Sequence, residues 1–318
     1  MRTTDLTRPQ AIVLLVALSL WGCTAPKDPW LDDTPTSGQV LILADEDLRA
    51  LVEAERSMFE AIYAKARLHV RYLPESALLK ALHNDSVRCY IGAVRPGADE
   101  QAWYDARNVK AHVVPIATDG IAVVVNKDCG LTPPTVQDLR ELLTGEHERS
   151  GGWGACDPSA PTATQPTAVV AGRGSGVARA LVDSLLQGSA SALRAQAGAS
   201  VDSVMALVAR DTHAIGLIPF SAISDLDDTA MVSMRQGIRI LPVARVPGSP
   251  AVMPTQSTLA DGSYPLRRPV YMVLAEGKSG LGTGFVSFVA NHKGQRIILK
   301  HGIAPNKVPP RDIQVVAP

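Results

Sequence analysis

The sequence has no excess of charge of either sign, because its 318 residues include 31 Lys and Arg and 31 Asp and Glu. It therefore offers no basic field to attract nucleic acid, and we expect no nucleic-acid partner. Beyond residue 23 no apolar run is long enough to span a membrane. The sequence has no internal repeat either. With 46% hydrophobic residues, the chain is instead typical of proteins with globular cores.

Cysteine is scarce, with only Cys23, Cys89, Cys129 and Cys156. The three that follow residue 23 leave at least one thiol free, unless it pairs between chains. A disulfide between Cys129 and Cys156 would close the proline-rich segment between them, but the sequence leaves this pairing open. The seven histidines are scattered without metal-ligand spacing, so we expect no metal and no cofactor.

Three common enzyme motifs are missing from the glycine-rich stretch AVVAGRGSGV at residues 168–177. Val177 stands where a dinucleotide fingerprint needs glycine, and the lysine of a phosphate-binding P-loop is absent. Arg173 stands where a nucleophile elbow needs glycine. No Ser–His–Asp grouping or pair of carboxylates is recognisable elsewhere. We therefore expect no catalytic residue and no enzyme, with a hydrolase as the disfavoured alternative.

The same stretch has the pattern of a strand, a tight turn and a helix. The apolar run 168–171 predicts a buried strand, and the glycines that follow permit a sharp turn. Ser175 is a good N-cap, apolar residues then recur at helical spacing, and Gly188 stands where a helix would end.

This arrangement predicts an anion-binding site. Free amides and the positive end of the helix dipole would meet at Ser175, where Gly174 and Gly176 allow an oxygen to approach the backbone. Arg173 can add guanidinium donors. The alternative is a glycine-rich turn without a ligand.

The N-terminal segment 1–23 is predicted to be a lipoprotein signal peptide. It has a basic start and a short apolar core, and it ends in Leu20-Trp21-Gly22-Cys23, which resembles a bacterial lipobox. Cys23 would then be lipidated and would anchor the protein to a membrane in the periplasm or cell envelope. A cleaved signal without lipid and an uncleaved anchor are the alternatives. Residues 24–38, rich in Pro, Asp, Thr and Ser, are predicted to be a flexible tether.

The remaining 280 or so residues have the length of two domains. Strands alternate with helices, which predicts an α/β fold with largely parallel sheets. Strands are expected at 40–44, 67–72, 87–94, 113–116, 120–125, 168–171, 214–218, 238–246 and 264–274. Helices are expected at 48–59, capped by Asp45 or Asp47, and at 76–82, 136–143, 177–187, 201–208, 284–290 and 294–300, with a loop at 247–262.

Several stretches carry a family resemblance through their order and spacing. They are PIATDGIAVVVN at 115–126, LRELLTG at 139–145, GSG at 174–176, HAIGLIP at 213–219, YPLRRPV at 264–270 and a final stretch at 288–302 that ends in GQRIILKHG. The chain resembles the periplasmic phosphate-binding protein of bacterial phosphate ABC importers, within the type II solute-binding superfamily. Its N-terminal half is similar to a lipoprotein branch with an acidic first loop.

The resemblance implies a two-lobed α/β fold that closes like a hinge on a ligand between the lobes. Residues 39–118 and 264–318 would form lobe 1, residues 119–263 would form lobe 2, and Tyr264 and Arg268 would pack at the hinge. It further implies a monomer that captures phosphate or a related inorganic oxyanion and delivers it to an ABC permease.

The resemblance also suggests which residues would contact the anion. Lobe 2 would contribute Arg173, Gly174, Ser175 and Gly176, whereas lobe 1 would contribute Asp47 and Arg95, with Thr118 at the crossover. The sequence departs from the family at Ala171, where members usually have an arginine, and at Val177, where they have a threonine. These departures favour an alternative, a lipoprotein of this fold with a lost or altered ligand that acts in signalling or protein interaction.

Overall fold

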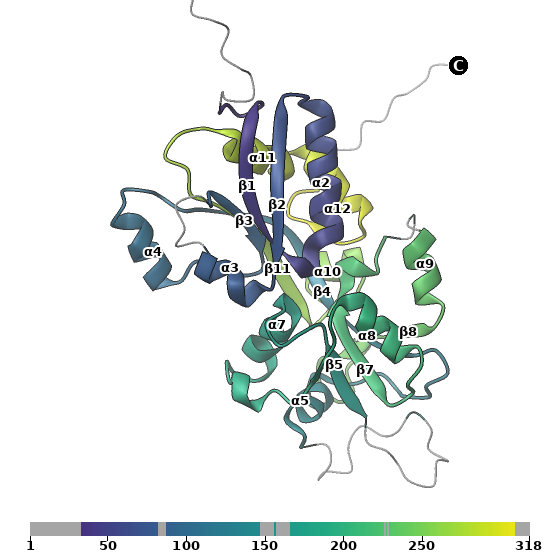
Figure 1. Ribbon diagram of the computed structural model, residues 1–318. Coiled ribbons are helices and arrows are strands. Elements are labelled where there is room, and N and C mark those ends of the chain that lie inside the picture. Colours follow the sequence, from purple (N-terminus) through teal and green to yellow (C-terminus); the bar gives the residue numbers. More distant parts are fainter. Residues whose placement is uncertain are drawn as a thin grey trace, which may run out of the picture.

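The structure is a computed structural model that describes residues 33–81, 87–146, 156, 166–225, 227 and 229–308. It is the expected two-lobed α/β fold, in which helices cover the faces of a curled sheet (Figure 1). The strands of the main sheet follow the order β2-β1-β3-β11-β4-β7-β5-β6, with β8 and β12 paired to β4. The ends of this sheet lie in different lobes, so the site between the lobes lies around its middle.

Lobe 1 contains the half of the sheet formed by β1, β2, β3 and part of β11. Strand β1 pairs in parallel with both β2 and β3, and β11 is antiparallel to β3. The apolar stripe of α2, which includes Leu51, Val52 and Phe59, packs in the core, where Phe59 meets Phe285 and Phe288 edge-on. The elements are β1 (Gly38–Asp45), the 3-10 helix η1 (Glu46–Leu48), α2 (Arg49–Ile62), β2 (Ala66–Leu73), α3 (Glu75–Ala81), β3 (Cys89–Gly92), α4 (Ala98–Asp105), α11 (Leu281–Ala290), α12 (His292–Lys300) and β12 (Ala304–Pro305).

Lobe 2 is built on β5, β6 and β7, which pair in parallel, and on β8. Helix α5 begins at a capping box between Thr135 and Asp138 and ends at Gly145, whose positive φ of 75° suits glycine. The elements are α5 (Val136–Thr144), β5 (Thr167–Val170), α7 (Gly176–Leu185), η2 (Ala190–Ala192), β6 (Gln196–Ala197), α8 (Val201–Val208), β7 (Ala214–Pro219), η3 (Phe220–Ala222), α9 (Thr229–Arg235), β8 (Ile238–Leu241), β9 (Val243–Ala244), β10 (Ala251–Val252) and α10 (Gln256–Asp261).

The two lobes share a single long strand. Strand β4 (His112–Asn126) pairs with β11 (Arg267–Leu274) and β12 along its first part, and with β7 and β8 along its second. The prediction of two strands broken at residues 117–119 was therefore wrong, because the polar residues there stay in the ladder and find tertiary partners. The predicted lobe boundary between residues 118 and 119 lies inside β4 and remains a prediction.

Three further expectations need correction. The strand predicted at 238–246 is divided into β8 and β9, because Pro242 lacks the N–H that a ladder needs. The predicted loop 247–262 contains β10 and α10, since Thr255 and Thr258 form a capping box. Helices α4 and α9 were missed, because both are short and α4 has only one buried side chain, Tyr104.

The N-terminal end of the described chain packs onto lobe 1 before the predicted boundary at residue 39. Asp33 accepts a hydrogen bond from the N–H of Leu281 at 2.9 Å, and its carboxylate lies 3.7 Å from Lys278. Residues 33–38 of the predicted tether therefore contact the start of α11. The predicted signal peptide, Cys23 and the first part of the tether lie outside the described residues. Within the described part, no helix has the length and apolarity needed to cross a membrane.

Cys129 and Cys156 form a disulfide, which realises the pairing that the sequence left open. The bond joins the segment after β4 to Cys156, which lies between α5 and β5 in the sequence. Cys89 is the free thiol among the described cysteines, and it is buried in β3. Its burial raises the pKa of the thiol, so Cys89 behaves as a small core residue rather than as a nucleophile.

Glu55 is a buried carboxyl in α2, and neither of its oxygens has a hydrogen-bond partner in the described structure. Burial raises its pKa to about 9. The folded protein thus keeps this proton up to about pH 9, whereas the unfolded chain releases it near pH 4. Between these values the unfolded state binds fewer protons, so the free energy of unfolding should fall as pH rises.

We expect Glu55→Gln to remove most of this pH dependence and to raise the free energy of unfolding at pH 8 by about 2 kcal/mol, because the amide needs no proton to be neutral. Urea unfolding between pH 5 and pH 9 measures the effect. Glu146→Gln, at an exposed position, is the control and should leave the pH dependence as it is. An unchanged pH dependence in Glu55→Gln would contradict the assignment.

Candidate anion-binding site between the lobes

The N-terminus of α7 lies against lobe 1. As the sequence predicts, Ser175 caps this helix, and its Oγ accepts a hydrogen bond from the N–H of Ala178 at 3.2 Å. The next free amide does not point into solvent. The N–H of Val177 donates to Oδ2 of Asp47, from the opposite lobe, at 3.0 Å. The end of the helix therefore already binds a carboxylate.

Gly176 lies in close contact with residues of β1 and β11. A Cβ at this position would lie 2.6 Å from Nη1 of Arg268 and closer still to Oδ2 of Asp45. Beside it, the carbonyl of Gly174 accepts a hydrogen bond from the N–H of Ser76, in α3, at 3.1 Å. The two glycines are thus required by the packing of this turn against lobe 1.

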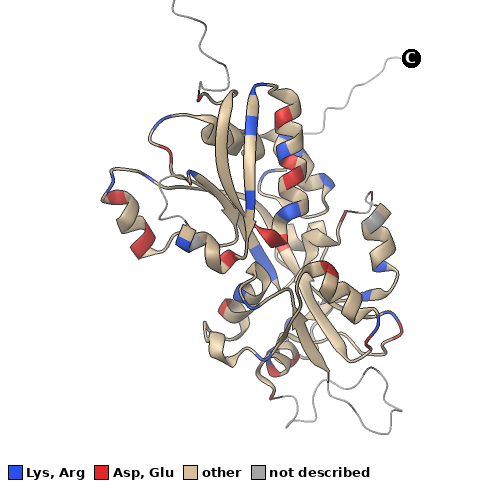
Figure 2. Ribbon diagram, in the orientation of Figure 1, with Lys and Arg blue, Asp and Glu red and all other residues tan. Residues whose placement is uncertain are grey.

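Three carboxylates surround one guanidinium at this contact. Arg268, on β11, has 1% of its side chain exposed and lies 3.2 Å from Asp119, 3.4 Å from Asp47 and 3.6 Å from Asp45. We call these four residues the central ion cluster. Figure 2 shows acidic ribbon at the end of β1 and in η1, just before α2, meeting basic ribbon on β11 where the lobes adjoin. The cluster joins β1, η1 and both crossover strands.

Two of the carboxylates, those of Asp119 and Asp45, also accept hydrogen bonds from backbone N–H groups. Oδ1 of Asp119 accepts from the N–H of Ser221, and Oδ2 accepts from the Ser221 hydroxyl at 2.8 Å. Asp45 is the N-cap of η1 and accepts from the N–H of Asp47. The prediction that Asp45 or Asp47 caps the helix at 48–59 was wrong, because the short helix η1 intervenes and α2 begins after Leu48 without a side-chain cap. Oδ1 of Asp47 and Oδ2 of Asp45 have no hydrogen-bond partner within the described structure.

The central ion cluster has three carboxyl groups and one guanidinium, and the pKa values of two of the carboxyl groups are raised. Burial and the neighbouring Asp47 raise the pKa of Asp45 well above its usual range, although Arg268 opposes this. Burial also raises the pKa of Asp47, against Arg268 and the amide of Val177. Burial lowers the pKa of Arg268, but the three aspartates raise it more, so the guanidinium stays charged. The site thus combines one permanent cation with carboxyls that can hold a proton.

A basic cavity of about 490 Å³ opens beside the cluster. Its arginines come from both lobes and from β11: Arg95 follows β3, Arg179 lies on α7, and Arg267 and Arg268 lie on β11. The acidic residues in its wall are Glu75 and Asp183. Burial raises the pKa of Glu75, partly offset by Arg268. Cavities lined mainly by one sign of charge concentrate counter-ions, so this one favours anions.

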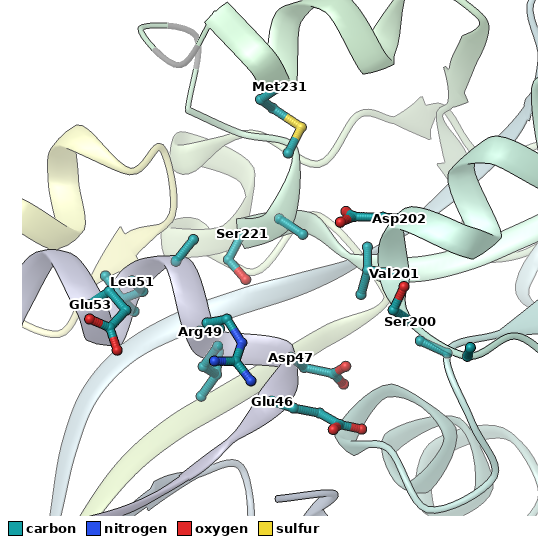
Figure 3. Close-up of a pocket in the computed structure, with 15 residues that line it drawn as sticks. Glu46, Asp47, Arg49, Leu51, Glu53, Ser200, Val201, Asp202, Ser221 and Met231 are labelled. Carbon is teal, nitrogen blue, oxygen red and sulfur yellow. The ribbon is translucent and has the colours of Figure 1, made fainter. Parts of the chain in front are cut away.

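An acidic cavity of about 470 Å³ meets the cluster at Asp47 and Ser221 (Figure 3). One wall is the start of α2 with η1, and the other is formed by the turn after β5, the start of α8, and η3. Glu46, Asp47, Glu53 and Asp202 line it, with Arg49 as the cation in its wall. This second cavity has the opposite charge from the first.

The other predicted anion ligands lie at different distances from this contact. The guanidinium of Arg95 stacks 4.3 Å from the ring centre of Tyr271 at the edge of the basic cavity. Arg173 is exposed in the turn before α7. Thr118 lies within β4, between Pro269 of β11 and Ala304 of β12. The structure therefore brings Ser175, Gly176 and Asp47 together, but it places Arg173 and Thr118 outside the central ion cluster.

Sequence reasoning left several of these residues out of the predicted site. Arg268 was expected only to pack the hinge, and Asp119 had no assigned role beyond the crossover. No sequence pattern marked Glu75, Arg179 or Ser221 as site residues. The one usable hint was the pair Arg267-Arg268 in an otherwise apolar strand, because a charged residue that must point inward needs a buried partner. No group of three or more potential metal ligands occurs among the described residues.

The comparison with protein families identifies the class of protein. The model of the PBP superfamily domain matches residues 32–293, which is most of the chain. The chain therefore belongs to the PBP superfamily, as its two lobes and the site between them also indicate.

Individual relatives are more distant. A stretch of 99 residues is 28% identical to phosphate-binding protein PstS 2 of Streptococcus pneumoniae, and it spans 31% of this chain and 28% of that protein. A putative phosphate ABC transporter substrate-binding protein with bound phosphate, from Clostridium perfringens, superposes with a TM-score of 0.67 at 21% identity, over 85% of this chain and 100% of that one. An ABC-type phosphate transport receptor from Vibrio cholerae gives 0.62 at 16% identity, over 84% and 100%. At these identities the solved structures support the fold.

Proposed function

We propose that this protein is an extracytoplasmic solute-binding lipoprotein that captures an inorganic oxyanion, phosphate in particular, and delivers it to an ABC permease. The observation that carries the proposal is the hydrogen bond from the α7 amide of Val177 to the carboxylate of Asp47. It places an anionic oxygen at a helix N-terminus between two lobes, beside a buried arginine. The names of the relatives in Streptococcus pneumoniae and Clostridium perfringens point to the same ligand.

The anion would replace the Asp47 carboxylate. It would enter through the basic cavity, which Arg95 and Arg179 line, and reach the amides beyond Ser175. Arg268 would pair with it from β11. Closure of the lobes around the anion would then exclude water and strengthen each of these contacts.

The same arrangement accounts for a choice of phosphate over sulfate. Hydrogen phosphate has a proton to donate, whereas sulfate at neutral pH has none. Asp45, which pairs with Arg268, and Asp47, once displaced from the α7 amides, would lie beside the anion, and an ionised carboxylate oxygen there would accept such a proton. The same oxygens would repel a sulfate, so they would weaken the binding of sulfate more than that of phosphate.

Thermal unfolding of the purified protein with phosphate, sulfate, molybdate or nitrate tests the proposal. Phosphate should raise the melting temperature most, since a ligand at one hundred times its Kd stabilises the folded state by about 2.7 kcal/mol. Ser175→Ala should shrink the rise, because it loosens the cap that orders the amides. Ser233→Ala, at an exposed position on α9 outside both cavities, is the control. A flat response to all four anions would overturn the proposal.

A second candidate function has one observation in its favour. The lobes already meet through Arg268, Asp47 and Asp119 and through the hydrogen bond from Ser76 to Gly174. A protein that acts in signalling or protein interaction, having lost its anion, would need such a ligand-independent contact. For that function we expect no stabilisation by any of the four anions, and an unchanged response in Ser175→Ala.

A further inference from the structure

The acidic cavity has the wrong sign of charge for an inorganic oxyanion. Its volume of about 470 Å³ lies in the range of pockets that hold organic small molecules. Apolar surface from Leu51, Val201 and Met231 lines it together with its carboxylates. This lining suits an organic ligand with a positive group.

The negative charge of this cavity is only partly compensated by neighbouring groups. Glu53 is engaged by Arg56 at 2.6 Å and by the hydroxyl of Tyr72 at 2.7 Å. The guanidinium of Arg49 lies over the Tyr72 ring, 3.9 Å from its centre. The described structure shows no ion pair for Glu46 or Asp202, which approach the cavity from opposite lobes (Figure 3). The cavity thus retains unpaired carboxylates on both sides.

Asp47 connects this cavity to the anion subsite. Its Oδ2 accepts from Val177, whereas its Oδ1 has no partner, and only 5% of the residue is exposed. An anion that displaced Asp47 from α7 would release a third carboxylate beside Glu46 and Asp202. Occupation of the anion subsite would therefore increase the attraction of the neighbouring cavity for a positive group.

Because the anion subsite and the acidic cavity meet at Asp47, we propose that the acidic cavity binds an organic ammonium group. The ligand would be an amino-substituted phosphate ester or phosphonate. This inference rests on the proposed oxyanion function. The anionic head occupies the α7 amides and pairs with Arg268, while the ammonium lies between Glu46 and Asp202. The hydroxyls of Ser200 and Ser221 line the same cavity and accept further hydrogen bonds from it.

A comparison of three probes with the full protein tests this inference. Inorganic phosphate probes the anion subsite alone, ethylphosphonate adds a neutral tail, and 2-aminoethylphosphonate adds the ammonium. We expect 2-aminoethylphosphonate to bind at least tenfold more tightly than ethylphosphonate by calorimetry. In the double variant Glu46→Gln, Asp202→Asn this preference should fall to within about twofold, while phosphate binding stays unchanged. Asp99→Asn, at an exposed position on α4 outside both cavities, is the matched control and should retain the preference.

The outcomes separate the inference from the proposed function. Equal binding of ethylphosphonate and 2-aminoethylphosphonate, with phosphate bound, overturns the inference and leaves the oxyanion function in place. Binding of ethylamine alone, without any response to the phosphorus compounds, overturns the two-headed ligand. If none of the probes binds, the oxyanion function itself fails.

Discussion

Replacement of Arg268 by methionine is expected to lower the free energy of unfolding by about 4 kcal/mol at neutral pH. The change leaves Asp45, Asp47 and Asp119 buried without their cation, and removing one partner of a buried ion pair commonly costs 3–5 kcal/mol. Methionine fills a comparable volume, so the loss would reflect charge rather than a cavity. Urea unfolding measures it.

The loss of stability in Arg268→Met should be smaller at acidic pH. In the variant Asp45 and Asp47, whose pKa values burial already raises, can become neutral by taking up protons, so its stability should approach that of the parent protein as pH falls from 7.5 to 5. Arg267→Met is the matched control, because Arg267 is the neighbouring residue on β11 but is exposed, with a hydrogen bond to the Leu259 carbonyl at 3.2 Å. It should cost no more than about 1 kcal/mol. Similar losses in both variants would contradict the central role of Arg268.

Replacement of Asp47 by asparagine is expected to reduce the preference for phosphate over sulfate at least tenfold, chiefly by allowing sulfate to bind. Two charges 4 Å apart repel by about 4 kcal/mol at the effective dielectric of a protein surface, so neutralising one carboxylate removes a large penalty for an anion without a proton. The amide oxygen can still accept from Val177. Calorimetric titration with both anions gives the ratio.

Asp99→Asn provides the comparison for this variant. Asp99 is exposed on α4 and lies outside both cavities, so its neutralisation removes one negative charge without touching the anion subsite. Its selectivity should remain that of the parent protein. If Asp47→Asn keeps the full preference for phosphate, Asp47 has no part in distinguishing the anions.

The strand, turn and helix around Ser175 could be predicted because their signals are local. A serine cap, glycines and apolar residues at helical spacing act within one short segment, and the structure has Ser175 as the cap of α7. The contact with Asp47 could not be predicted in the same way. Its partners are 130 residues apart, and Asp47 and Arg268 are 221 residues apart. Only the tertiary fold determines which buried carboxylate meets which cation.

The error in β4 has a related cause. Thr118, Asp119 and Gly120 look like a turn because polar and glycine residues rarely continue a central strand. Here Asp119 accepts hydrogen bonds from Ser221 and pairs with Arg268, so the strand continues through it. Local preference was outweighed by contacts that form only when both lobes are present. The same reasoning applies to Asp47, which looks like a helix cap in the sequence but accepts its hydrogen bond from Val177 of α7.

The course of the chain through β4 and β11 has a consequence for biosynthesis. Lobe 2 is formed from one continuous stretch, but β1, β2 and β3 need β11, α11 and α12, which are made last. A chain that grows from its N-terminus would complete the later lobe first, while the earlier strands wait with an unpaired edge on β3. Such an edge can pair with the wrong neighbour, so truncation before residue 267 should yield an aggregating fragment rather than a smaller folded protein.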